Sequence, residues 1–155
     1  MKMELLYQLK FEYTYILPPI FFSKDTHLSS QHYFELTGEV SGKINGKFRG
    51  VNHPVKRSDD VFLSNTQAVI ETDDAAFIYL DLKGYGVVPN QHADLYRSYM
   101  GPIKHVSDHE KYRSLNKIWC FGEGEVGATV DKKVTHTSGT TVINVYALHW
   151  EPLQK

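Results

Sequence analysis

The strongest constraint on the fold is a run of alternating apolar and polar residues near the N-terminus. Between Glu4 and Ile16, every second residue is apolar or aromatic, and this face consists of Leu5, Tyr7, Leu9, Phe11, Tyr13 and Tyr15. A period of two over this length predicts a half-buried β-strand whose aromatic face points inward. Pro18-Pro19 follows and ends the strand.

A second alternating run, GEVSGKINGKFRG, spans Gly38 to Gly50. All of its glycines fall on the face that also carries Val40, Ile44 and Phe48, so this face is predicted to point inward. Missing side chains there permit strong coiling of the sheet or leave room for a bulky neighbour. An equally good interpretation places a tight hairpin turn at Asn45-Gly46, which splits the run into two strands.

Further strands are predicted near residues 61–63, 67–82 and 140–150, and one short helix near Gln91–Met100. Asn90 can cap the helix, and Gly101-Pro102 ends it. Many strands with one helix indicate a mainly β fold, either a sandwich or a closed antiparallel barrel. The glycine face favours the barrel, and the whole chain, 1–155, is expected to form a single domain.

Composition excludes several classes of partner. The net charge is −1 and no run of lysine and arginine occurs, so we expect no nucleic-acid or membrane partner. Cys120 is the one cysteine and cannot form an internal disulfide. The first residues contain charges among the apolar residues and lack the sequence pattern of a signal peptide, so we expect a cytoplasmic protein.

The motifs of metal and cofactor sites are missing. Eight histidines are present, but none has the spacing of a zinc or metalloprotease site. The segment GEGEVG, at Gly122–Gly127, lacks the lysine and the helix of a phosphate-binding loop. We therefore predict no metal and no cofactor.

Two adjacent acids, Asp73 and Asp74, interrupt the apolar pattern of the 67–82 segment. If the strand is regular, Asp74 shares the inward face with Ile70 and Ile78, whereas Asp73 points outward. A desolvated inward carboxyl would have a raised pKa, which suits a general acid or base. The alternative is a turn or bulge in which the carboxylates bond to the local backbone.

Three segments of the chain resemble the domain-of-unknown-function 3237 family, in the same order and over nearly the whole length. The first is the glycine-rich run described above. The others are TDDAAFIYLDLKGYG and KYRSLNKIWCFGEGE, whose matching residues are Thr72, Asp73, Asp74, Ala76, Tyr112, Leu115, Asn116, Gly122 and Gly124. Departures occur at Ala75, where the family has glycine, at Ser114, where it has tryptophan, and across Val51–Asp60.

The resemblance implies a small antiparallel barrel similar to calycins and to allene oxide cyclase, often assembled as a homo-oligomer, and assigns no activity. With 13% aromatic residues, the chain can supply either a packed core or an aromatic-lined cavity. We predict binding of a small apolar or aromatic molecule, with ligand-contacting residues Tyr7, Phe11, Tyr13, Phe48 and Tyr112.

Three functions remain open. One is a metal-free isomerase or cyclase in which Asp74 is the acid or base and Asn116, across the lumen, orients an oxygen. The second is a ligand-binding barrel without chemistry, and the third is a structural or oligomerisation subunit.

Overall fold

The computed structural model describes residues 1–24, 26–87, 96–127 and 141–152. Eight antiparallel strands close into a barrel in the order β7-β5-β4-β1-β11-β10-β9-β8, and β8 pairs with β7 to complete the ring. The predicted closed antiparallel barrel is therefore confirmed.

The elements follow one another with short connections wherever the chain is described. Their bounds are β1 (Lys2–Ile16), β2 (Ile20–Phe21), β3 (Leu28–Gln31), β4 (Phe34–Gly42), β5 (Gly46–Asn52), β6 (Val55–Arg57), β7 (Phe62–Thr72), β8 (Phe77–Val87), β9 (Tyr96–Val106), the 3₁₀ helix η1 (Arg113–Lys117), β10 (Trp119–Gly127) and β11 (Thr141–His149).

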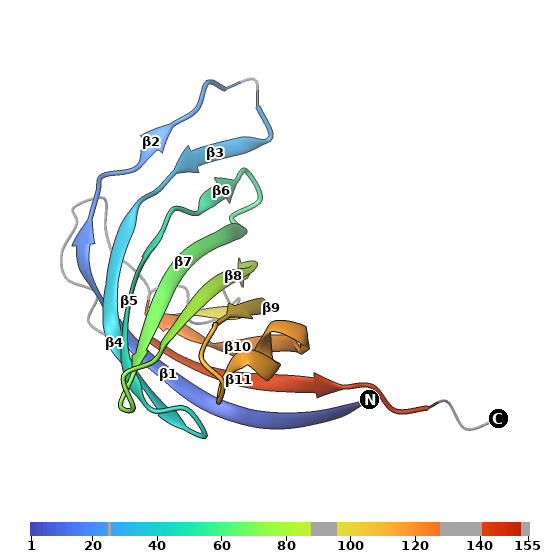
Figure 1. The fold of residues 1–155 in the computed structure, drawn as a ribbon. Helices are drawn as coiled ribbons and strands as arrows, with labels where there is room; N and C mark the ends of the chain where they lie inside the picture. Colours follow the sequence, from blue (N-terminus) through green and yellow to red (C-terminus); the bar gives the residue numbers. More distant parts are fainter. Residues whose placement is uncertain (25, 88–95, 128–140, 153–155) are drawn as a thin grey trace.

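Three short strands extend the sheet beyond the barrel. β6 pairs with the start of β7, β3 pairs with β6, and β2 pairs with β3. Figure 1 shows β2, β3 and β6 stacked beyond one end of the barrel, whereas the start of β1 and the end of β11 lie side by side at the other end. There, Lys2 of β1 pairs with His149 of β11.

The alternation of β1 directs its side chains as predicted, with two exceptions, Leu5 and Tyr15, which lies beyond a register shift with β4 and is 49% exposed. Tyr7, Leu9 and Phe11 are buried in the core and Tyr13 packs against it. Leu5 was predicted to face inward, but its side chain is 49% exposed. The register with β11 shifts between Leu5 and Tyr7, and such a bulge turns the preceding residues to the other face.

The glycine-rich run is a hairpin, which decides between the two interpretations of that segment. β4 ends at Gly42 and β5 begins at Gly46, and Asn45 closes the turn by bonding the amide and the carbonyl of Gly42. Within β4, Gly38 lies between Phe11 of β1 and Phe48 of β5. The two rings contact across it, with centroids 5.6 Å apart.

The helix predicted near Gln91–Met100 is wrong in its second half. Residues 96–100 belong to β9, and residues 91–95 lie outside the described part of the chain. The single helical segment among the described residues is η1. No helix in the described residues is long and apolar enough to cross a membrane.

Candidate functional site

One half of the barrel lumen contains a cavity of about 60 Å³, here called the upper-lumen cavity. It lies at the end near β6 and is lined mainly by apolar and aromatic side chains. The lining residues are Phe11, Tyr13, Phe34, Phe48, Asn52, Pro54, Phe62, Ser64, Thr66, Leu82, Gly86, Arg97, Tyr99, Val126 and Ile143. Because a buried water needs about 10–15 Å³ on this measure, the cavity can hold several waters, whereas a benzene-sized ligand needs about 150 Å³ and therefore requires lining side chains to move outward.

The sequence of β7 explains why the lumen is open in one half only. Its first half turns the small polar residues Ser64 and Thr66 toward the lumen, and Gly86 lies opposite Phe62 across the β7–β8 pair. Its second half turns Ile70 inward against Ile78, and both are fully buried. Small residues therefore leave space above, and branched apolar residues fill the lumen below.

Arg97, on β9, brings the guanidinium group into this apolar cavity. Its central carbon lies 4.2 Å from the ring centroid of Phe62, a stacking geometry that is favourable for arginine. The Nη1 atom is buried and has no hydrogen-bond partner among the described residues. Burial lowers the pKa of Arg97, while the nearby Tyr13 and Asp60 oppose that change.

Below the cavity, the packed half of the lumen contains a buried polar pair. The hydroxyl of Tyr7 is hydrogen-bonded to Nε2 of His105 at 2.7 Å, and His105 is only 1% exposed. Burial lowers the pKa of His105 to about 4 and raises that of Tyr7 well above its ordinary value. His105 is therefore neutral near pH 7, and its Nδ1 has no partner among the described residues.

Cys120 belongs to the same packed region. Its thiol is buried, and burial raises its pKa to about 11. A thiol that stays protonated at neutral pH is a weak nucleophile, so Cys120 acts as a small core residue.

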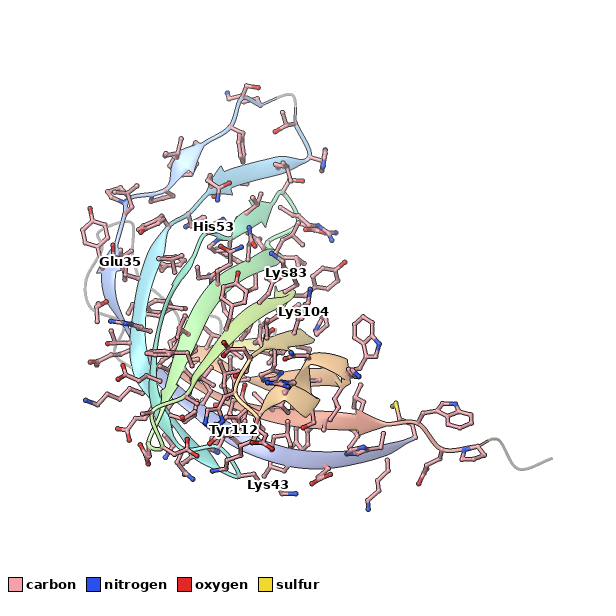
Figure 2. All side chains as sticks on the ribbon, in the orientation of Figure 1. Glu35, Lys43, His53, Lys83, Lys104 and Tyr112 are labelled. Carbon is pink, nitrogen blue, oxygen red and sulfur yellow. The ribbon has the colours of Figure 1, made fainter. Side chains whose placement is uncertain are left out.

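The structure brings three of the five predicted ligand-contacting residues to the cavity. Phe11, Tyr13 and Phe48 line it. Tyr7 does not, because it lies in the packed half and bonds to His105. Tyr112 lies at the opposite end of the barrel, where its hydroxyl bonds to Asp74. Figure 2 shows this separation: Tyr112 and Lys43 lie at one end, and His53, next to the cavity-lining Asn52 and Pro54, lies at the other.

The inward position predicted for Asp74 is wrong. Its carboxylate is 39% exposed and accepts hydrogen bonds from Lys111 Nζ at 2.6 Å, Thr72 Oγ1 at 2.6 Å and Tyr112 OH at 2.9 Å. These bonds hold the pKa of Asp74 well below its usual range, whereas a raised pKa was expected. The catalytic role predicted for Asp74 depended on a desolvated lumen position, and the geometry gives it no support.

A tight turn between β7 and β8 explains why the alternation failed at this residue. Thr72 and Ala76 are both buried and bonded to each other through Thr72 N to Ala76 O and Ala76 N to Thr72 Oγ1. Asp73, Asp74 and Ala75 form the loop, and Ala75 has the left-handed φ of 62°. Such a loop keeps the inward phase of the flanking strands while its own side chains face outward.

Asn116 also has a structural role in place of the predicted lumen position. Its Oδ1 accepts the amide of Ser107 at 2.8 Å, and its Nδ2 donates to the Ser107 carbonyl at 2.9 Å. These bonds tie η1 to the end of β9. Asn116 is exposed, makes no bond with Asp74, and does not reach the cavity.

Sequence reasoning missed Arg97, Tyr99, Phe34 and Phe62 as lining residues. Arg97 and Tyr99 were assigned to a helix, although Arg97, Tyr99, Gly101, Ile103 and His105 alternate along β9. This period of two was the signal that could have found them. No cluster of histidine, cysteine and carboxylate side chains able to hold a metal occurs among the described residues.

Comparison with known proteins identifies similar folds but does not identify a function. No family model matches the chain, and no curated protein matches it. A protein of unknown function from Clostridium acetobutylicum shares 18% identity and a TM-score of 0.76, over 96% of this chain and all of its own. A β-barrel-like protein from Acinetobacter baumannii shares 19% identity and a TM-score of 0.73, over 96% of each chain.

A more distant neighbour is described as an enzyme. It comes from Penicillium herquei and has a TM-score of 0.60 and 15% identity, over 96% of this chain and 94% of its own. At these identities, the likeness extends to the fold alone. The chain is therefore similar in fold, over almost its entire length, to these three solved structures.

Proposed function

We propose that this protein binds a small apolar or aromatic molecule in the upper-lumen cavity. The observation that carries the proposal is the cavity itself, a hollow in an otherwise packed barrel, walled by Phe11, Phe34, Phe48 and Phe62. Protein interiors are normally packed without such space. Mostly apolar cavities with a few polar groups are the usual form of a small-molecule site.

The packed lower lumen supports the same proposal. Ile70, Ile78, Leu80 and Val145 are completely buried there, so the stability of the barrel does not depend on an open upper half. Leaving apolar side chains around a void costs stability. A ligand that fills the void would recover part of that cost.

Titration with neutral aromatic probes, followed by amide NMR, tests the proposal. We expect benzyl alcohol and indole to bind saturably, with shift changes concentrated on the residues that line the cavity. Val126→Phe adds a ring to the lining and should weaken both probes about tenfold or more, because the probe and the new side chain compete for one space.

Val106→Phe is the matched control, because Val106 is exposed on the outer face of the barrel. It adds the same group outside the lumen and should leave probe binding unchanged. Absence of saturable binding in the wild-type protein, or equal effects of the two variants, would contradict the proposal.

Catalysis in the same cavity is a second candidate, favoured by the description of the Penicillium herquei neighbour as an enzyme. The hydroxyls of Tyr13 and Tyr99 belong to lining residues, and burial raises both pKa values. The Tyr13 hydroxyl could donate a hydrogen bond to a substrate oxygen, whereas the Tyr99 hydroxyl already donates to the carbonyl oxygen of Lys83 at 2.7 Å. The NMR spectrum and chromatographic retention of the ligand recovered after incubation separate the candidates, because a binding protein returns its ligand unchanged, whereas an isomerase or cyclase alters its structure even where its mass stays the same.

Three further expectations stay predictions. Membership of the domain-of-unknown-function 3237 family is supported by the barrel fold and by the place of its Thr-Asp-Asp motif in the β7–β8 turn. The homo-oligomeric state can be measured by light scattering. The cytoplasmic location is supported by composition alone.

A further inference from the structure

Arg97 is the one charged side chain among the described residues that line the upper-lumen cavity. The other polar lining groups are neutral amides and hydroxyls, from Asn52, Ser64, Thr66 and the tyrosines. A cation in such surroundings is costly unless a countercharge or hydrogen-bond acceptors compensate for its lost hydration.

No described residue supplies that countercharge. Arg97 is in no ion pair with a described carboxylate, and its buried Nη1 has no hydrogen-bond partner among them. Asp60 lies near enough to raise the pKa of Arg97, but its carboxylate is paired with Lys56 at 2.6 Å. The guanidinium is therefore positioned by its stacking on Phe62 and not by a salt bridge.

A guanidinium held in this way is suited to binding a carboxylate. Its planar N–H groups match the two oxygens of a carboxylate, and such charge-assisted bonds are strong in a dry site. A single cation can balance a single negative charge, so a monoanion fits this cavity better than a dianionic phosphate ester. The phenylalanine rings around it would contact the apolar part of the same molecule.

We propose that Arg97 anchors the carboxylate of the ligand, which is a small aromatic or apolar monocarboxylate. The inference rests on the proposed function, because it names the class of molecule held in the cavity. It adds that binding depends on charge, and that Arg97 selects the ligand.

The test compares two probes of nearly the same shape, benzoate and benzamide, by calorimetric or NMR titration at pH 7.5. Wild-type protein should bind benzoate about tenfold or more tightly than benzamide, the difference expected for a charged hydrogen-bonded pair. Arg97→Met keeps an unbranched apolar side chain in place of the aliphatic part of arginine and removes the charge. It should abolish the preference for benzoate and leave benzamide binding within about threefold.

Arg49→Met is the matched control, since Arg49 is exposed on the outer face of β5. It changes the net charge equally and should keep the preference for benzoate. Arg97→Met should also melt no lower than the wild type, because the lost charge has no ion-pair partner among the described residues and its buried Nη1 makes no hydrogen bond with them. A structural role for Arg97 would instead lower the melting temperature.

The outcomes separate this inference from the proposed function. Equal binding of benzoate and benzamide, together with normal binding of benzyl alcohol, overturns the role of Arg97 alone. Failure of all three probes overturns the proposed function as well. A benzoate preference that survives in Arg97→Met also overturns the inference, and so does tighter binding of phenyl phosphate than of benzoate by the wild-type protein.

Discussion

Asp74 joins two segments that are far apart in the chain. Its carboxylate lies in the β7–β8 turn and bonds to Lys111 and Tyr112, which precede η1. Thr72 completes the set of donors from within the turn. The residue thus closes one end of the barrel, at the end opposite the upper-lumen cavity, and its function is to hold two loops together.

The first prediction concerns the pH dependence of this contact. The folded-state pKa of Asp74 lies below the unfolded-state value of about 4. The ionised carboxylate therefore adds stability that is fully present above that value and is lost as the pH falls through the folded-state pKa. Asp74→Asn should lower the free energy of unfolding at pH 7, and its difference from the wild type should shrink below about pH 4.

Urea unfolding at several pH values measures this difference. Asp73→Asn is the control, because Asp73 lies in the same turn and its side chain makes no hydrogen bond with the described residues. It should have little effect at any pH. A deficit of Asp74→Asn that stays constant down to pH 2 would show that the carboxylate charge contributes nothing.

At the residue scale, the alternation in the sequence correctly predicted which residues on either side of Asp73 and Asp74 face the core. It did not predict that the two acids lie in a turn. Ile70, Thr72, Ala76 and Ile78 are all buried, as the alternation required. Asp74 does not follow the alternation because the residues of the turn do not continue the pleat of the strands. A turn at these acids is the alternative that the sequence leaves open. Its donors, Lys111 and Tyr112, come from a distant segment, so no local pattern could have identified them.

At the scale of the elements, the packing of β4 depends on a missing side chain. A Cβ on Gly38 would lie 2.7 Å from the Cα of Phe11 and closer still to the carbonyl oxygen of Lys10. The strands β1 and β4 can approach this closely because Gly38 has no side chain. The close approach also brings the rings of Phe11 and Phe48 together at the wall of the cavity.

Gly38→Ala should accordingly lower the free energy of unfolding by about 1–3 kcal/mol, the usual cost of overpacking. Gly86→Ala is a milder comparison, because its Cβ would meet the Cβ of Phe62 at 3.3 Å, and it should cost less than about 1 kcal/mol. Chemical denaturation of both variants gives the two values. Equal costs would mean that the fit at Gly38 does not limit the barrel.

The barrel strands were largely predictable as elements, because alternation survives in a sheet that has one face in the core. β9 was the exception. Asn90, the spacing of Leu95 and Tyr99, and Gly101-Pro102 resemble a capped helix, yet residues from 96 onward pair with β8 and β10. Pairing on both sides overrode the local pattern, and a single sequence contains no record of such pairing.

In the molecule as a whole, the two halves of the lumen have different roles. The packed half, with the Tyr7–His105 pair, stabilises the barrel, and the upper half holds the proposed ligand site. The location of a cavity could not be predicted from the sequence, because it depends on which residues of different strands lie at the same level. The aromatic composition left both a cavity and a packed core possible, and the barrel has each in one half.

Acid should weaken the whole fold through His105. Its pKa is about 4 in the folded protein, against about 6.5 when exposed. The unfolded chain therefore takes up a proton first, and stability is complete above pH 6.5 and falls toward pH 4, by up to about 3 kcal/mol. Stability measured across this range should decline less in His105→Gln.

His27→Gln is the control for this experiment, since His27 is exposed, and it should keep the wild-type decline. His32, whose pKa is also lowered to about 4 by burial, contributes part of the decline that remains in His105→Gln. A wild-type unfolding free energy that does not change between pH 6.5 and 4 would contradict this account of the packed half.

The most direct test of the central claim is a crystal structure of the protein grown with benzoate. The account predicts the ring among Phe11, Phe48 and Phe62 in the upper-lumen cavity, with the carboxylate within hydrogen-bond distance of Arg97. Benzoate bound only outside the barrel, or a cavity filled by rearranged side chains with no ligand in it, would contradict the claim.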